Sequence, residues 1–413
     1  MIVRDTSSGR YVINLSLVPI LVVLLEIVIT LSHSAYLPVM PQFAADMLIS
    51  DDQARDTLLL YTLGSASLYL FVGPFSDRFG RRLILIWGGV CFVVASAICA
   101  ITSNISLFYV MRFVQGISVC TTMTAGYASI HELLERKIVI QVLAWMYAVG
   151  VLVPALGPLL GAIILLFGTW RLLFWIFFVV GIIVVFALYR LMPESLPVEK
   201  RHQIKLLPIL KNYYLIIKNP LFSLNTLIYS ILNCGLFAWV AVGPFLIIEE
   251  FKENDFLFGI YQVLIFGLFI IGTMAIRYAM KFFSTRIISF VGVVIAFISA
   301  VLAVVFAIIF PKSLLALIVC LMFFAGGSGF SFPSINRTAI ESSTGPAGAT
   351  VATFFTGSAL FGALGTFLPN IIYDGSIFSL AVIIGLCGIV AMLLKLILLL
   401  KYTRIQIWGR NQV

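Results

Sequence analysis

Twelve apolar stretches of about 20 residues or more follow one another along this chain, separated by short polar or Pro/Gly-containing segments. A helix needs about 20 mostly apolar residues to cross the hydrocarbon core of a bilayer. Because a backbone surrounded by lipid must satisfy its own hydrogen bonds, each stretch is predicted to be a membrane-spanning helix. The predicted spans are 14–38, 57–76, 82–102, 107–131, 138–166, 170–191, 221–248, 256–280, 286–310, 313–337, 347–371 and 376–400.

The composition agrees with this prediction. Of the 413 residues, 62% are hydrophobic and only 10% are charged, which is too little charge to cover the surface of a water-soluble protein of this length. The expected fold class is therefore an all-α membrane protein with 12 transmembrane helices. The cysteines and histidines have no metal-ligand spacing, so we expect neither a metal site nor a cofactor.

The distribution of positive charge predicts the orientation. With the N-terminus inside, 21 of the 26 Lys and Arg residues fall on the cytoplasmic side, four fall outside and Arg112 lies within the membrane. We therefore expect a multi-pass membrane protein with both termini in the cytoplasm. The net charge of +9 is then a topology signal, and no nucleic-acid partner is expected.

The longest polar stretch is basic and lies in the middle of the chain, with six predicted spans on either side. This arrangement predicts an N-terminal six-helix half over residues 1–192, a cytoplasmic linker over 193–219 and a C-terminal six-helix half over 220–413. The two halves are expected to be pseudo-symmetric.

A first motif, G-P-F-S-D-R-F-G-R-R, fills Gly73–Arg82 between spans two and three. Gly80 permits a tight turn, and Asp77 can pair with an arginine or with the N-terminus of a helix. Arg78 and Arg81 keep this connection on the inner face. An ordinary basic loop would account for the arginines but not for the whole ordered pattern.

A second motif, R-F-V-Q-G, begins at Arg112 inside span four and includes Gln115 and Gly116. A charged side chain at the centre of a membrane helix costs about 2.5–3.5 kcal/mol on insertion scales, so an intramembrane arginine indicates a functional site. The alternative is that Arg112 extends its guanidinium to the outer interface.

A third motif lies in span five, where Pro154, Gly157, Pro158 and Gly161 follow one another at helical spacing. Glycine and proline bend a helix and let a neighbouring helix approach closely. Generic packing of small residues is the alternative explanation.

The three motifs resemble signatures of the major facilitator superfamily, and further residues resemble its drug:proton antiporter branch of 12-spanning proteins. The resemblance implies a location in the bacterial inner membrane and substrate binding near the midplane between two six-helix halves. It also implies a conformational latch at the first motif, proton coupling at Arg112, and export rather than uptake from the third motif. The residues that narrow the resemblance are Glu26, Tyr36, Leu37, Pro38, Gly126, Tyr127, Ala128, Glu132, Met146 and Trp170.

Glu26 is the only acidic residue deep in a predicted span. A lone carboxylate is costly to bury in its charged form, so the protonated form is favoured and its proton can be exchanged. Thr30, His33, Ser34 and Leu37 follow on the same helical face, which we expect to line the substrate cavity. A permanent hydrogen bond from Glu26 to a neighbouring helix is the alternative.

The chain departs from the antiporter branch at Ser34, where relatives carry a second acidic residue. Either Glu26 alone carries proton coupling, or His33, which exchanges protons near neutral pH, takes the second role. His33 as a plain polar residue near the outer interface is the third possibility.

Two further groups complete the predicted site. Glu132 and Arg337 lie at the cytoplasmic ends of spans four and ten and are candidates for an inner gate, with solvated helix ends as the alternative. The substrate-cavity candidates are Thr30, Ser34, Gln115, Tyr127, Met146, Asn233, Trp239 and Phe361.

The predicted function is proton-coupled export of lipophilic small molecules or drugs, with cationic compounds as candidates, driven by the proton gradient and without a cofactor. A dedicated exporter of a metabolite or siderophore is the alternative. An uptake symporter and a membrane-embedded enzyme are less well supported, because the third motif marks exporters and no nucleophile, metal cluster or acid–base pair is found. The expected partners are a small-molecule substrate, protons and membrane lipid, and the chain is expected to be a monomer.

Overall fold

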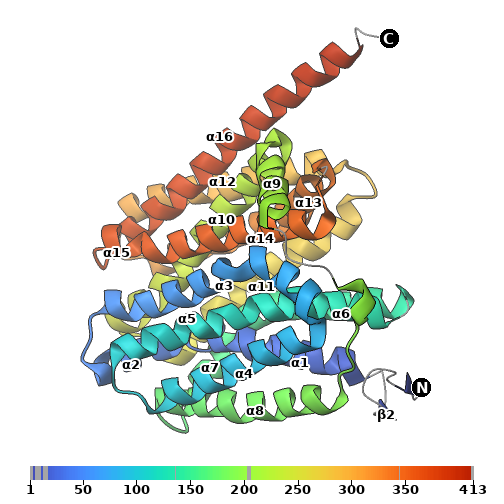
Figure 1. Cartoon of the computed structure of the whole chain (residues 1–413). Helices are drawn as coiled ribbons and strands as arrows, with labels where there is room; N and C mark the ends of the chain where they lie inside the picture. The colour runs from blue at the N-terminus through green and yellow to red at the C-terminus, as the bar shows by residue number, and fades with distance from the viewer. Residues whose placement is uncertain are drawn as a thin grey trace. The chain divides into compact units, whose positions relative to one another are not determined.

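The computed structural model describes residues 3–4, 11–12, 17–134, 136–201, 206–343 and 345–410. The chain divides into two compact units, the first formed by residues 1–206 and 253–260, the second by 207–252 and 261–413. In the first half of the chain the elements are β1 (Val3–Arg4), β2 (Tyr11–Val12), α1 (Leu17–Ser34), η1 (Leu37–Val39), α2 (Met40–Met47), α3 (Asp51–Phe79), α4 (Arg81–Ile101), α5 (Ile105–Thr121), η2 (Thr122–Gly126), α6 (Tyr127–Leu133), α7 (Arg136–Leu165), α8 (Trp170–Leu191) and η3 (Val198–Lys200) (Figure 1).

The elements that follow are also helical. They are α9 (Leu206–Lys218), α10 (Pro220–Pro244), η4 (Phe245–Glu250), α11 (Asp255–Ala279), α12 (Thr285–Ile309), α13 (Leu314–Ser342), α14 (Ala347–Phe367), α15 (Pro369–Ile372) and α16 (Ile377–Arg410). Among the described residues the one β pairing is the two-residue antiparallel pair β1–β2, with Val3 opposite Val12.

The helices coincide with the predicted spans. In the described part of the chain, 11 helical segments are long and apolar enough to cross a membrane, and they fall on 11 of the 12 predicted spans. The remaining span is α7, a helix of 30 residues in which several side chains lie outside the described ones.

Helix α3 is longer than the predicted span 57–76. It begins at Asp51, because the Ser50 hydroxyl and the Gln53 side chain form a reciprocal capping box at its N-terminus. It ends at Phe79, so most of the first motif is helical. The predicted loop is reduced to Gly80, whose φ of 101° lies in the region that favours glycine.

Helix α1 ends sooner than the predicted face requires. The α-helix stops at Ser34, and Leu37 lies in the short 3-10 turn η1, so Leu37 does not continue the face of Glu26. The physical reason is Pro38, which has no N–H to donate to the carbonyl oxygen of Ser34 and so interrupts the α-helical hydrogen bonds.

Two helices contain π-helical turns that the sequence did not predict. The turn η2 interrupts the helix formed by α5 and α6, and η4 follows α10. Such turns are rare and often occur at functional sites. Here η2 lies between Arg112 and Tyr127, two residues of the predicted site.

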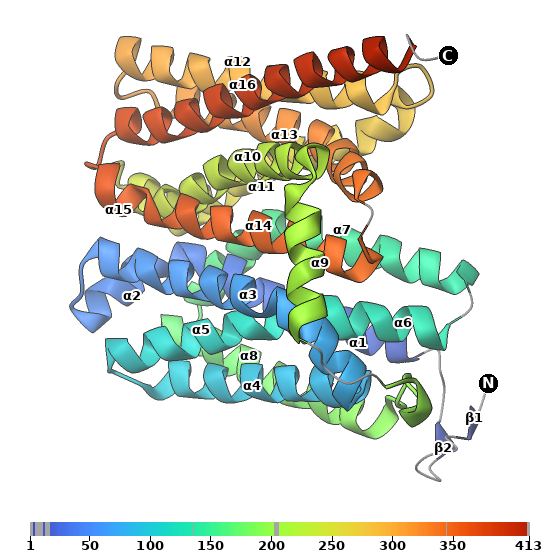
Figure 2. The same ribbon diagram turned by 45° about the horizontal axis from the view of Figure 1, so that its top comes forward.

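Helices α3 and α5 pack side by side at two glycines (Figures 1 and 2). A Cβ at Gly64 would overlap the carbonyl oxygen of Phe113, and a Cβ at Gly116 would overlap the carbonyl oxygen of Tyr61. The two backbones therefore touch in both directions, as is common where small residues meet in membrane proteins.

Two residues or segments assigned to the cytoplasmic side have structure that the sequence did not predict. The predicted linker 193–219 contains a helix, α9, of 13 residues. Lys395, counted among the cytoplasmic charges, is only 2% exposed and donates a hydrogen bond of 2.7 Å from Nζ to Ser289 Oγ. The packing of α12 against α16 buries this side chain.

Candidate functional site

Arg112 is buried inside the first unit. Its side chain has no exposed surface, which excludes the alternative that it reaches the outer interface. The guanidinium carbon lies 4.6 Å from the centre of the Tyr36 ring and 4.8 Å from that of Tyr61. Two aromatic faces thus stabilise the buried cation, an interaction that strengthens when water is excluded.

Hydrogen bonds connect Arg112 to two other helices. Its Nη1 donates to the carbonyl oxygen of Ser32 on α1 at 3.2 Å and to Gln115 Oε1 at 2.9 Å. Gln115 in turn donates from Nε2 to Ser96 Oγ on α4, at 2.9 Å. The second motif therefore has a structural explanation, because Gln115 orients the arginine and Gly116 admits α3.

Arg112 retains unused hydrogen-bonding capacity. Its Nε and Nη2 are buried without an acceptor, and among the described residues no carboxylate lies within salt-bridge distance of it. Buried donors without partners are costly, so this cation can accept a further negative or polar partner when one becomes available.

Glu26 is buried in the middle of α1. Only 2% of it is exposed, and its Oε2 has no hydrogen-bond partner. The described residues contain no basic group in ion-pair contact with it. The permanently hydrogen-bonded alternative therefore does not hold for Oε2.

The surroundings of Glu26 include the π-helical turn of span four. A Cβ at Gly126 would lie 2.9 Å from Val22 Cγ1, and Val22 is one helical turn before Glu26 on the same face of α1. Tyr127, which follows η2 directly, is half-buried. The turn that precedes Tyr127 therefore packs against the helix that carries Glu26.

The other polar residues of α1 have different surroundings. Thr30 and His33 are half-buried, and the His33 ring lies 4.9 Å from the Tyr61 ring that also supports Arg112. Ser34 is only 3% exposed and donates a hydrogen bond of 3.0 Å to the carbonyl oxygen of Thr30. His33 is therefore a neighbour of the Arg112 cluster, whereas Ser34 is packed.

The partner of Ser34 is the third motif. A Cβ at Gly157 would overlap the Ser34 side chain, and a Cβ at Gly161 would overlap the carbonyl oxygen of Ala35. Pro154 and Pro158 lie within the same helix, α7, one turn before each glycine. Because the motif has small residues at these positions, the end of α1 packs directly against the backbone of α7.

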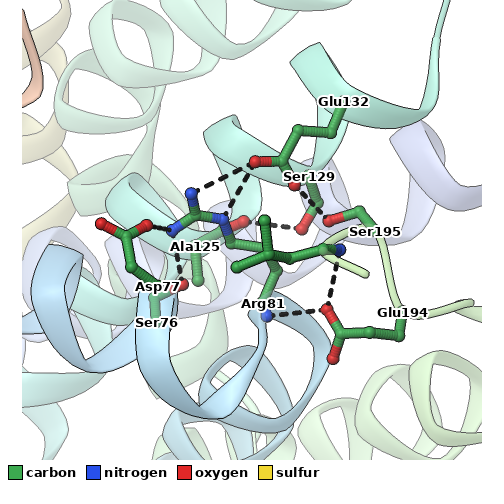
Figure 3. A network of polar contacts seen from close by, with 9 residues as sticks. Ser76, Asp77, Arg81, Ala125, Ser129, Glu132, Glu194 and Ser195 are labelled. Carbon is green, nitrogen blue, oxygen red and sulfur yellow. Dashed lines mark hydrogen bonds and ion pairs between the residues drawn. The ribbon is translucent and has the colours of Figure 1, made fainter. Parts of the chain in front are cut away.

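The first motif is part of a polar network at the end of α3 and α4, shown in Figure 3. Arg81 pairs with Asp77 at 2.6 Å and with Glu132 at 3.2 Å. It also donates from Nη1 to Ser76 Oγ at 3.0 Å. Arg81 is only 12% exposed, so these interactions are better shielded than those of a surface ion pair.

The network includes two residues that sequence reasoning missed. Glu194, just after α8, accepts a hydrogen bond of 2.9 Å from the backbone N–H of Arg81, and Ser195 donates one of 2.6 Å to Glu132 (Figure 3). Glu194 also pairs with Arg201 at 3.5 Å. A carboxylate directly after a span that ends beside an arginine cluster was the available signal.

Removing the Glu194 carboxylate is expected to destabilise the first unit. Glu194 caps the N-terminus of α4, and loss of a capping side chain costs about 1 kcal/mol. We expect Glu194→Ala to lower the free energy of unfolding by about this amount, measured by chemical denaturation in detergent. Glu199→Ala, at an exposed neighbouring carboxylate, is the matched control. Equal losses in both variants would contradict the capping role.

The remaining residues of the predicted latch and inner gate make fewer interactions than Arg81 does. Arg78 is exposed and lies 5.2 Å from the ring of Phe79, and Gly73 makes no close approach. Arg337 pairs with Glu341 one turn along α13 at 2.7 Å, with both side chains more than half exposed. Such an exposed pair contributes little to stability.

The predicted cavity residues of the second unit lie on two helices. Asn233 on α10 donates from Nδ2 to the carbonyl and hydroxyl oxygens of Ser358 on α14, each at 3.3 Å. Phe361, one turn after Ser358, is half-buried. Trp239 is fully buried and donates from Nε1 to Gln262 Oε1 at 3.0 Å. In the first unit Met146 and Gln115 are also fully buried.

These features define a polytopic helical membrane protein in which two charged residues, Arg112 and Glu26, are buried within the apolar helices. The chain belongs to the Major Facilitator Superfamily, whose family model matches residues 22–366. It is accordingly a membrane transporter rather than an enzyme, and the resemblance drawn from the three motifs is confirmed.

Among individual proteins the chain is similar to transporters named multidrug transporter MdfA. It is 32% identical over 260 residues to the protein of Yersinia pestis bv. Antiqua (strain Angola), with 63% of each chain covered. It is 34% identical over 223 residues to that of Escherichia coli O6:H1 (strain CFT073), with 54% of each covered. The alignments thus span less than two thirds of these relatives.

Two solved structures share the fold. The nucleoside transporter NupG superposes with a TM-score of 0.72 at 11% identity, covering 92% of this chain and 99% of NupG. A bacterial homolog of the human lysosomal transporter Spinster, in an inward-facing and unoccupied conformation, gives 0.70 at 14% identity, covering 93% and 94%. At these identities the likeness establishes the fold alone.

Proposed function

We propose that this chain is a proton-coupled exporter of lipophilic small molecules or drugs, cationic compounds among them, that works by alternating access in the bacterial inner membrane. The observation that carries the proposal is Glu26, a carboxyl group buried in the middle of α1 without an ion pair among the described residues. An intramembrane ionisable group is costly to retain unless it has a function. The similarity to proteins named multidrug transporter MdfA supports the class of substrate.

In the proposed cycle, proton and substrate compete for Glu26. With Glu26 protonated, the buried group is neutral, so it is tolerated in the low-dielectric interior. A cationic substrate near Glu26 favours the carboxylate and expels the proton. Release of the substrate on the outer side lets Glu26 take up a proton there, and the proton gradient then drives the return. Arg112, with two nitrogen atoms that have no acceptor, can stabilise the carboxylate form in one of the conformations.

Further elements of the proposal concern the membrane faces. Both termini and the network of Figure 3 are assigned to the cytoplasmic side, because that side then collects most of the Lys and Arg residues. The pairs of Arg81 with Asp77 and Glu132 would act as the latch that opens and closes in each cycle. The glycines of α7 support export, since they resemble the antiporter signature. The protein is proposed to act as a monomer.

Proton release tests this proposal. Purified protein in weakly buffered detergent solution is expected to release protons when lipophilic cations are added, as a pH-sensitive dye would record. Glu26→Gln should release none, although its fold is retained because the amide is the same size. No release from the wild-type protein across a varied compound panel would favour the alternative, a dedicated exporter of one metabolite. Equal release from the variant would remove Glu26 from the coupling role.

A further inference from the structure

An apolar groove lies between α4 and α8 of the first unit. Its lining consists of Ile86, Val90 and Val93 on α4 and of Ile182, Val185 and Phe186 on α8, and its volume is about 320 Å³. Tyr189 completes the lining at the end nearest Gly80. Both helices are long and apolar enough to cross a membrane, and Ile182 and Phe186 are more than 40% exposed. The groove therefore opens toward lipid rather than toward water.

Two arginines stand at the Tyr189 end of the groove. Arg82 donates from Nη2 to the carbonyl oxygen of Tyr189 at 2.6 Å, and its guanidinium carbon lies 5.6 Å from the centre of the Tyr189 ring. The guanidinium carbon of Arg190 lies 5.1 Å from the centre of the Phe186 ring. Both cations thus contact aromatic side chains that line the groove.

These two charges are not neutralised within the described part of the chain. The nearby carboxylates have other partners, since Asp77 and Glu132 pair with Arg81, and Glu194 pairs with Arg201. No carboxylate of the described residues pairs with Arg82 or Arg190, and Arg82 Nε is buried without an acceptor. A guanidinium with an unused donor at the membrane interface is suited to bind a phosphate.

We infer that this groove binds an anionic phospholipid, with one acyl chain along α4 and α8 and the headgroup phosphate held by Arg82 and Arg190. The apolar lining matches the hydrocarbon chain, and the two unpaired guanidinium groups match the negative headgroup. Basic residues at a membrane surface attract anionic lipids, each by an amount that corresponds to about a fivefold change in affinity. A zwitterionic lipid fits the groove equally well but does not neutralise the two arginines.

Native mass spectrometry of the purified protein in a non-ionic detergent tests the inference. Titration with dioleoylphosphatidylglycerol is expected to give tighter binding than titration with dioleoylphosphatidylcholine. Arg82→Gln and Arg190→Gln should each weaken binding of the anionic lipid about fivefold. They should weaken binding of the zwitterionic lipid less, because its choline cation offsets the charge of its phosphate. Val90→Phe, which fills the groove, should weaken binding of both lipids.

Matched controls test whether the loss of any exposed cation, or added bulk outside the groove, also changes lipid binding. Arg277→Gln removes an exposed cation from α11, and Ile183→Phe adds bulk to a residue of α8 that is 62% exposed and does not line the groove, so neither should change binding. Equal affinities for the two lipids, or unchanged binding by Arg190→Gln and Val90→Phe, would overturn the inference. Full displacement of the lipid by glycerol phosphate would show a free-anion site instead. The assay does not depend on transport, so its outcome is independent of the role proposed for Glu26.

Discussion

Membrane vesicles that carry Glu26→Gln are expected to show no proton-driven efflux, with substrate movement falling to the rate of vesicles without the protein. Glutamine keeps the size and the hydrogen-bonding oxygen of the side chain but cannot take up or release a proton. Because Glu26 is the one carboxyl group buried deep within a span among the described residues, no neighbouring acid can replace it. Efflux driven by an imposed pH gradient in proteoliposomes measures this directly.

Two controls make this prediction specific. Substrate binding by Glu26→Gln, measured by equilibrium dialysis, should persist for neutral compounds, which shows that the variant is folded. His33→Asn should keep part of the coupled efflux, because we assign no obligatory proton to His33. Complete loss in His33→Asn with retained efflux in Glu26→Gln would transfer the coupling role to His33.

The second large effect is expected at the contact of α3 with α5. Gly116→Val should prevent accumulation of folded protein or lower the free energy of unfolding by about 3 kcal/mol or more, at the upper end of overpacking effects. The added Cβ would overlap the carbonyl oxygen of Tyr61, which is backbone and can move only if the helices separate. Their separation would also disturb Arg112, whose ring partner Tyr61 lies on α3.

Yield and thermal unfolding of purified protein in detergent measure this effect. Gly267→Val is the matched control, because a Cβ at Gly267 has no atom within 4 Å and valine has the better helix propensity. We expect the control to be at least as stable as the wild-type protein. Similar losses in both variants would show that the close α3–α5 contact is not the cause.

Several features of the site could be predicted from the sequence, because each depends on the chemistry of a single residue and not on its neighbours in space. Arg112 and Glu26 are charges within apolar runs, so their burial and functional interest followed from the cost of charge in lipid. Gly80 was predicted at a turn, and its φ of 101° agrees. The pairing of Asp77 with an arginine was also anticipated, and the partner is Arg81.

Other features of the site could not be predicted, because they depend on which helices pack against one another. The packing of Ser34 could not be read from its position, because it depends on the close approach of Gly157 on α7. Glu132 contacts Arg81 and Ser195, which are far from it in sequence, so its partners could not be read from its position at a helix end. The charge count alone could not predict that Lys395 is buried against α12, where it donates to Ser289.

The amino-acid sequence by itself determined the class of protein and the placement of its spans. The physical reason is that lipid imposes a local requirement, about 20 apolar residues with internally satisfied backbone bonds, which each segment meets or fails alone. Only the tertiary structure decided how Arg112 is held between two tyrosines, how Glu194 caps α4, and where α4 and α8 leave a groove. These features arise from contacts between distant segments, and hydropathy does not encode which segments meet.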